Sequence, residues 1–387
     1  MSLGSRDASK AIARAERAVL AIRQVEQTYM DAAAEGQTEL PSDDLASALD
    51  AFAELEALTA IHLETEDVAR AAVCGSVRLA AVGRSIGKLD LVRRVNGLLA
   101  RLAQQPSPDA VTRRAFAEAS NDLMLAEADA DQLDAAIETY FGIAALSDTY
   151  PTDSDLTGAR AKAAANLIAL TLEAGRDKVA DLVMRELEAL CRTFPAEKLV
   201  ALQMARGRFN RLAWTARTGS PDAAIAELET LFESALRSPA DVDMLDITSD
   251  AAFVLVTRLG TRQHHKAARK GFDVLSKLAA LPAAGDPIMG RLAEAAFNLI
   301  TDLCENDRRD EAQLIYDDLA GLSVAEDDNA KIRLAQAKGA ANLAMTHEAV
   351  GDVVAAELLT ADLRALVHAH PDDMAIFEIA ALVDQTN

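Results

Sequence analysis

The residue types that most often do chemistry, histidine, cysteine and paired acids, are sparse in this sequence and lie far apart. The three cysteines, Cys74, Cys191 and Cys304, form no CxxC pair, while His368 and His370 are two positions apart. Side chains two apart on a helix point to different faces, so these two histidines should not share a metal ion. We therefore predict no catalytic residue, no metal site and no cofactor.

The usual signatures of phosphate-binding and hydrolytic enzymes are also missing from the sequence. No GxxxxGKS/T or GxGxxG loop could cradle a phosphate, and no GxSxG turn could present a nucleophilic serine. The pair His264-His265 is expected in a turn, where it would be solvated. Acidic pairs such as Asp317-Asp318 are expected at helix surfaces or turns, where solvated acids are common.

The composition indicates an all-helical chain. Only 18 glycines and 10 prolines occur among 387 residues, and aromatic residues make up 4% of a sequence that is 50% hydrophobic. Many-stranded sandwiches and barrels need frequent turns and many β-branched or aromatic residues, so we exclude them as the main architecture. A single core stops growing near about 250–300 residues, so this length requires several domains or a quasi-linear array.

The strong negative charge restricts the partners. The chain carries 39 basic and 61 acidic residues, for a formal net charge of -22. Polyanions and anionic membrane surfaces would be repelled, so we predict no nucleic-acid and no membrane partner, whereas a basic protein segment would be attracted. The first forty residues hold no apolar core of a signal peptide, and the widely spaced cysteines suit a reducing compartment. We therefore expect a cytoplasmic protein.

Self-similarity at a spacing of 44 residues is the clearest feature of the sequence. One position occupied by small or aliphatic residues recurs seven times without a gap, at Val92, Ala136, Ala180, Ala224, Ala268, Ala312 and Ala356. A column of aliphatic residues follows it by seven positions, and a column of only glycine and alanine precedes it by seventeen. A period of this length is typical of stacked helical repeats.

Each 44-residue stretch is predicted to form a helical hairpin. Glycines recur where two helical stretches must be joined, at Gly87, Gly175, Gly219 and Gly351. A glycine there can adopt the left-handed conformation that ends a helix. In the second helix, Ala136, Tyr140 and Ile143 form one apolar stripe. We divide the chain into an N-terminal hairpin cap over residues 1–66, seven hairpins over 67–374 and a C-terminal capping helix over 375–387.

The columns resemble the tetratricopeptide repeat family. A small residue followed four positions later by a bulky one, as in Ala136 and Tyr140, matches the family's second helix, and Asn166-Leu167 matches its first. The resemblance covers residues 67–374, although the usual repeat has 34 residues and its tryptophan position is not kept. It implies an all-α fold of the α-α superhelix class, a right-handed solenoid. HEAT-like repeats fit the length better but rank second, because their interhelical Asp and Arg columns do not occur here.

The resemblance also implies a concave groove, lined by the first helices, that holds a partner. A run of phenylalanines at one first-helix position, the asparagines beside it and basic residues three positions earlier could line this groove. These candidates are Phe209, Phe253, Phe297, Asn166, Asn210, Asn298, Asn342, Lys162, Arg206 and Lys338. Alternatively, the phenylalanines pack between adjacent hairpins and the asparagines bond the neighbouring helix.

These observations predict a non-catalytic scaffold that binds a partner protein or peptide in this groove. Two alternatives stay open: a scaffold that self-associates through its end caps as a homo-oligomer, and an enzyme built as a closed α/α toroid. The toroid is disfavoured, because the cavities of such enzymes are usually rich in aromatic residues and this chain has one tryptophan.

Overall fold

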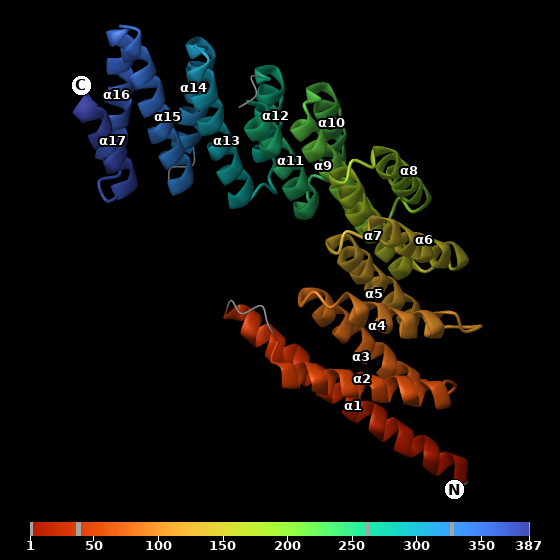
Figure 1. The fold of residues 1–387 in the computed structure, drawn as a ribbon. Helices are drawn as coiled ribbons and strands as arrows, with labels where there is room; N and C mark the ends of the chain where they lie inside the picture. Colours follow the sequence, from red (N-terminus) through yellow and green to blue (C-terminus); the bar gives the residue numbers. More distant parts are fainter. Residues whose placement is uncertain (1–2, 36–39, 261–263, 326–328, 387) are drawn as a thin grey trace. The chain divides into compact units, whose positions relative to one another are not determined.

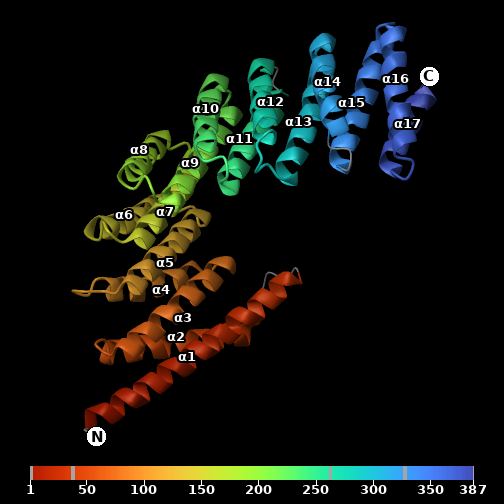
Figure 2. The same cartoon turned by 180° about the vertical axis from the view of Figure 1, so that it is seen from behind.

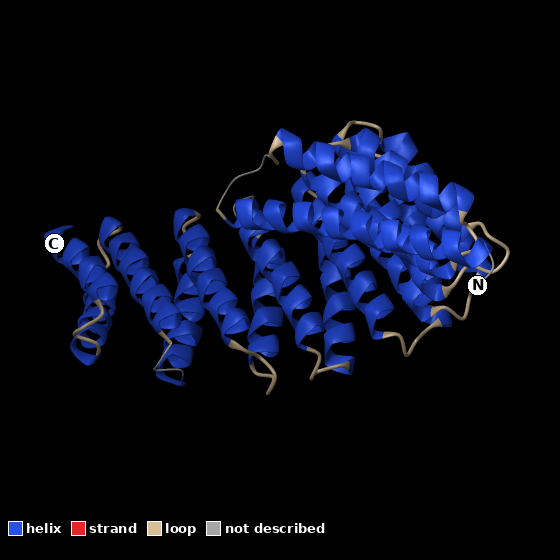
Figure 3. Cartoon of the chain, turned by 90° about the horizontal axis from the view of Figure 1, so that it is seen from below, coloured by secondary structure: helices blue, strands red, loops and turns tan. Residues whose placement is uncertain are grey.

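The protein is an all-α solenoid. The computed structural model describes residues 3–35, 40–260, 264–325 and 329–386, and within these ranges all regular structure is helical (Figure 3). The chain divides into two compact units, Met1–Gly207 and Arg208–Asn387, and the division falls inside helix α9 (Lys198–Thr218). The fold class expected from the sequence is confirmed.

The first unit is a stack of helical hairpins. Its helices are α1 (Leu3–Ala34), α2 (Ser42–Ile61), α3 (Glu66–Ser85), α4 (Leu89–Ala103), α5 (Ala110–Asp129), α6 (Leu133–Thr149), α7 (Ser154–Glu173) and α8 (Asp177–Thr193). The first helices of the hairpins pack on one another, α1 on α3, α3 on α5 and α5 on α7 (Figure 1). Each first helix also packs on its own second helix. Each hairpin is therefore buried by its neighbours in the stack.

The second unit follows the same scheme. Its helices after α9 are α10 (Pro221–Arg237), α11 (Val242–Gly260), α12 (His265–Ala279), α13 (Asp286–Glu305), α14 (Arg309–Ala325), α15 (Ala330–Ala349), α16 (Val353–Ala369) and α17 (Met374–Thr386). The first helices α11, α13, α15 and α17 pack in sequence. The second helices α10, α12, α14 and α16 form the other layer, as views from both sides show (Figures 1 and 2).

The turns inside the hairpins share one geometry. A residue with positive φ follows the first helix at Gly87, Asp131, Gly175, Gly219, Asp307 and Gly351. In the first of these turns, the Lys88 amide donates to the Gly83 carbonyl over 2.8 Å. This bond between residues five apart satisfies a carbonyl at the helix end. Glycine adopts the left-handed conformation without cost, and aspartate is among the few other residues that tolerate it.

Small side chains bring the helices close together. A Cβ added at Gly75 on α3 would lie 2.6 Å from Leu55 Cδ1 on α2, closer than real contacts allow. The predicted stripe of α6, Ala136, Tyr140 and Ile143, is fully buried. Apolar burial at helical spacing therefore holds each hairpin in place.

Candidate functional site

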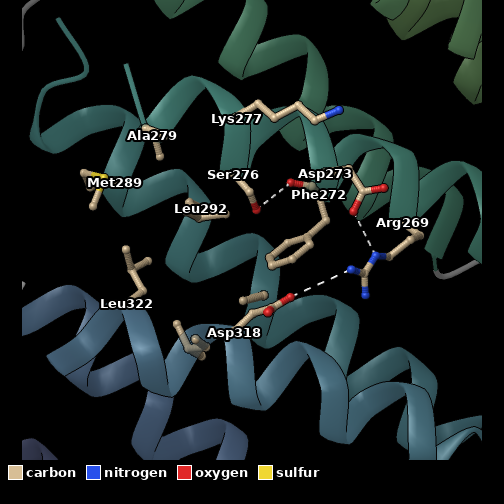
Figure 4. Close-up of a pocket in the computed structure, with 13 residues that line it drawn as sticks. Arg269, Phe272, Asp273, Ser276, Lys277, Ala279, Met289, Leu292, Asp318 and Leu322 are labelled. Atoms are coloured by element: carbon tan, nitrogen blue, oxygen red, sulfur yellow. Dashed lines mark hydrogen bonds and ion pairs between the residues drawn. The ribbon is translucent and has the colours of Figure 1, made fainter. Parts of the chain in front are cut away.

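A groove on the second unit lies between the second helices α12 and α14 and has α13 as its floor (Figure 4). We call it the open groove. Its volume is about 690 Å³. Phe272 belongs to the buried stripe of α12, Met289 and Leu292 rise from α13, and Leu319 and Leu322 come from α14. The floor of the open groove is therefore apolar.

Charged side chains line the rim of the open groove. Arg269 Nε lies 2.9 Å from Asp273 Oδ1 on the same helix, and Arg269 Nη2 lies 3.8 Å from Asp318 Oδ2 across the groove (Figure 4). Lys277 borders the groove on α12, but its ammonium points away from it and lies 5.9 Å from the centre of the Phe232 ring on α10 (Figure 4). The side chains of Arg269, Asp273 and Asp318 are 44%, 41% and 58% exposed. Ion pairs this exposed contribute between about 0 and 1 kcal/mol, so the bridge over the groove is weak.

The corresponding groove of the first unit, between α6 and α8 over α7, is occupied by the chain itself. We call it the filled groove. Arg160 rises from α7 with its side chain only 10% exposed, and its Nη1 lies 2.6 Å from Asp148 Oδ1. Its Nη2 lies 3.6 Å from Glu186 Oε2 on α8, which accepts a 2.8 Å hydrogen bond from the Tyr140 hydroxyl on α6. Only about 260 Å³ of space is left.

Burial controls the protonation of the tyrosine in the filled groove. Burial, and then the charge of Glu186, raise the pKa of Tyr140 well above its ordinary value. The hydroxyl therefore stays protonated and donates to Glu186 at any physiological pH. The Tyr140 hydroxyl and the Nη atoms of Arg160 thus have carboxylate partners, whereas the buried Arg160 Nε makes no hydrogen bond to the described residues.

A related arrangement occurs between α14 and α16. The Tyr316 hydroxyl lies 3.4 Å from Asp362 Oδ2, 46 residues further on, as Glu186 is from Tyr140. Gln336 on α15 stands at the position of Arg160, 176 residues later. Burial, and then the charge of Asp362, raise the pKa of Tyr316 above its usual range. A polar side chain therefore rises from the first helix wherever the aromatic residue is a tyrosine.

The residues proposed from the sequence lie on the first helices, whereas the open groove is rimmed by second helices. Lys162, Asn166 and Arg206 belong to the first unit, and Phe209, Asn210, Phe253, Phe297, Asn298, Asn342 and Lys338 belong to the second. The phenylalanines and asparagines are half-buried, and the three basic residues are exposed. None of these ten residues lines the open groove.

Two of the predicted asparagines bond the preceding first helix. Asn166 Nδ2 donates to Asn121 Oδ1 over 2.9 Å, and Asn342 Nδ2 donates to Thr301 Oγ1 over 2.8 Å. Both partners are side-chain oxygens, so these two asparagines bond the neighbouring helix, as the alternative reading of the sequence expects. Lys338 Nζ lies 5.5 Å from the centre of the Phe297 ring, within reach of a cation-π contact. Side-chain contacts at these positions therefore connect adjacent first helices.

The sequence-based expectation for His265 is wrong. This residue begins α12, and its side chain is 11% exposed instead of solvated. His265 Nδ1 lies 2.9 Å from Asp302 Oδ2, a buried carboxylate on α13 whose pKa is raised by burial. A partner 37 residues away along the chain cannot be recognised from the local turn pattern.

In the part of the chain that the structure describes, no cluster of three or more histidine, cysteine, aspartate or glutamate side chains could hold a metal ion. Nor is any described helix long and apolar enough to cross a membrane.

Comparison with known proteins adds little. No family model and no curated protein matches the chain. One solved structure, described as a circular tandem repeat protein with novel repeat topology and enhanced subunit contact surfaces, is 12% identical and covers 97% of this chain and 100% of its own. Its TM-score is 0.39. A likeness of this degree carries nothing about function or assembly.

Proposed function

We propose that the protein is a non-catalytic scaffold and that a partner protein or peptide docks in the open groove. One observation carries the proposal: the open groove leaves about 690 Å³ above an apolar floor, where the filled groove holds a buried arginine. A concavity with an apolar floor and a charged rim is a common form of a peptide-binding surface.

Site-specific photocrosslinking tests this proposal. A benzoylphenylalanine in place of Lys277, at the rim of the open groove, should capture a polypeptide in the native host. The matched control is the same group at Ala145, the exposed residue 132 positions earlier beside the filled groove. Capture at Lys277 but not at Ala145 supports docking. Identical capture at both positions, or none, contradicts it.

The first-helix surface is a second proposed contact of the same partner. Phe253 and Phe297 lie on α11 and α13, which pack on each other. Binding that falls on Phe253→Ala and Phe297→Ala with helicity unchanged would support this contact. Unfolding of the second unit would instead indicate that the rings only pack the hairpins.

We infer further that the hairpins are tetratricopeptide-like with a 44-residue repeat. The positive-φ residues of the described turns support this inference, since their spacings are all multiples of 44. The cytoplasmic location and the preference for a basic partner stay predictions.

Self-association is the second candidate function. Val353, Val354 and Leu358 on α16 are 58%, 71% and 65% exposed, an apolar surface that a second copy could cover. Sedimentation across a concentration series, with Leu358→Glu beside the parent chain, tests it. Association that Leu358→Glu abolishes supports it, and a concentration-independent monomer excludes it.

A further inference from the structure

Three positions that form the filled groove recur in the open groove. Tyr140, Arg160 and Glu186 are each followed, 132 residues later, by Phe272, Leu292 and Asp318. The aromatic ring from the first rim helix and the carboxylate from the second are thus retained. Two other features change: the arginine on the floor becomes a leucine, and Asp148, the closest partner of that arginine, becomes Ala280.

The filled groove shows which group such a site accepts. Arg160 places its guanidinium between Asp148 and Glu186, at 2.6 and 3.6 Å. Guanidinium is the cation best suited to carboxylates, because it is planar and more weakly hydrated than an ammonium group. The chain therefore contains its own example of an arginine seated in this kind of groove.

The open groove keeps one of the two carboxylates and supplies no cation from its floor. Asp318 stands at the position of Glu186, whereas Ala280 stands at that of Asp148. Phe272 and Leu292 on the floor are only 3% and 5% exposed, but Leu322 and Ala280 at the edge of the groove offer apolar surface on which the methylene groups of a long side chain can lie. The net charge of the chain, -22, also favours the approach of a cation.

We propose that the docked partner is a helical segment that inserts an arginine side chain into the open groove. This proposal rests on the proposed function. Its guanidinium binds Asp318, and its methylene groups lie against Leu322 and Ala280. The arginine of the partner occupies in the open groove the place that the chain's own Arg160 occupies in the filled groove.

The resident Arg269 competes for the same carboxylate. Its contact with Asp318 is 3.8 Å long and both side chains are well exposed, so an incoming guanidinium can replace it while Arg269 keeps its 2.9 Å contact with Asp273. Removing Arg269 should then strengthen binding of an arginine. If the groove instead took an acidic segment, removing Arg269 would weaken binding.

The test uses three synthetic helical peptides that differ at one central residue: arginine, citrulline or norleucine. Citrulline keeps the shape of arginine without its charge, and norleucine keeps only an apolar chain. Fluorescence anisotropy on the full chain should show the arginine peptide binding about tenfold more tightly than the citrulline peptide, as expected for a charge-assisted hydrogen bond. The arginine peptide should also block crosslinking at Lys277.

Two substitutions locate the contact. Asp318→Asn should remove the preference for arginine over citrulline, and Arg269→Ala should raise affinity for the arginine peptide about threefold. Both sites are exposed, so circular dichroism should show an unchanged fold. Equal binding of all three peptides at Lys277 overturns the arginine inference and leaves the proposed docking site intact. Failure of every peptide to compete at Lys277 overturns the inference, and absence of native capture there overturns the docking site.

Discussion

The filled groove and the open groove are built by corresponding helices but differ at several positions. Leu292, Phe272 and Ala280 stand where the filled groove has Arg160, Tyr140 and Asp148. In the first, Arg160 is held by Asp148 and Glu186, and the Tyr140 hydroxyl completes a polar network. In the second, Leu292 leaves an apolar floor beneath a weak ion pair. If the open groove binds a partner as proposed, a repeated scaffold turns a structural position into a binding position by changing a few side chains.

The largest expected effect comes from emptying the filled groove. Arg160→Leu leaves Glu186 partly buried with no cation beside it, which should destabilise the first unit by about 2–3 kcal/mol. Hydrogen exchange should locate the loss in α6, α7 and α8, because stacked hairpins respond locally. Unchanged protection in these helices would mean that the network does not stabilise the unit, and the two grooves would then differ only in shape.

Removing the tyrosine hydroxyls sharpens the comparison at a smaller scale. Tyr140→Phe should cost about 1 kcal/mol, because it removes a 2.8 Å hydrogen bond to Glu186. Tyr316→Phe should cost less, since its hydroxyl lies 3.4 Å from Asp362. Urea denaturation of both variants measures the difference. Equal losses would show that burial, and not the hydrogen bond, sets the contribution of each tyrosine.

The same tyrosines predict a dependence on alkaline pH. Burial raises the pKa of Tyr140 and of Tyr316 above the unfolded value of about 10, so the folded chain holds these protons longer than the unfolded chain. Their contribution is complete below pH 10 and is lost as the pH rises further. Denaturation midpoints measured from pH 8 to 11 should fall at the alkaline end, and less steeply for the double Phe variant. If the midpoints of the parent chain and the double Phe variant fell equally with pH, the raised pKa values of the two tyrosines would be contradicted.

The smallest effect is expected at the rim of the open groove. Arg269→Ala should change stability by less than about 1 kcal/mol, because the ion pairs it breaks are exposed to solvent. A double-mutant cycle with Asp318→Asn measures their coupling. A coupling energy well above 1 kcal/mol would show that Arg269 closes the groove, and the contrast with the filled groove would disappear.

Much of the fold could be predicted from periodicity alone. The stripe Ala136, Tyr140 and Ile143 is buried as expected, and positive φ occurs at each glycine named for a turn. These features are local, since each depends on residues within one hairpin. Helical spacing and turn chemistry are therefore sufficient to predict them.

The open groove could not be predicted, because it depends on which residues meet across three helices. One signal was present: Arg160 stands in a column whose other members include Phe116, Met204 and Leu292. A charged residue in a column whose other members are uncharged indicates a buried polar network, and its replacement by leucine indicates where that network is missing.

The most direct test of the account converts the open groove into the filled one. Leu292→Arg supplies the floor arginine from the chain itself, next to Asp318. Because Leu292 is buried and Ala280 replaces Asp148, we expect this variant to lose about 2–3 kcal/mol of stability, to stay folded by circular dichroism and to lose the partner captured at Lys277. A folded Leu292→Arg chain that still captures the partner at Lys277 would contradict the claim that the open groove is the docking site.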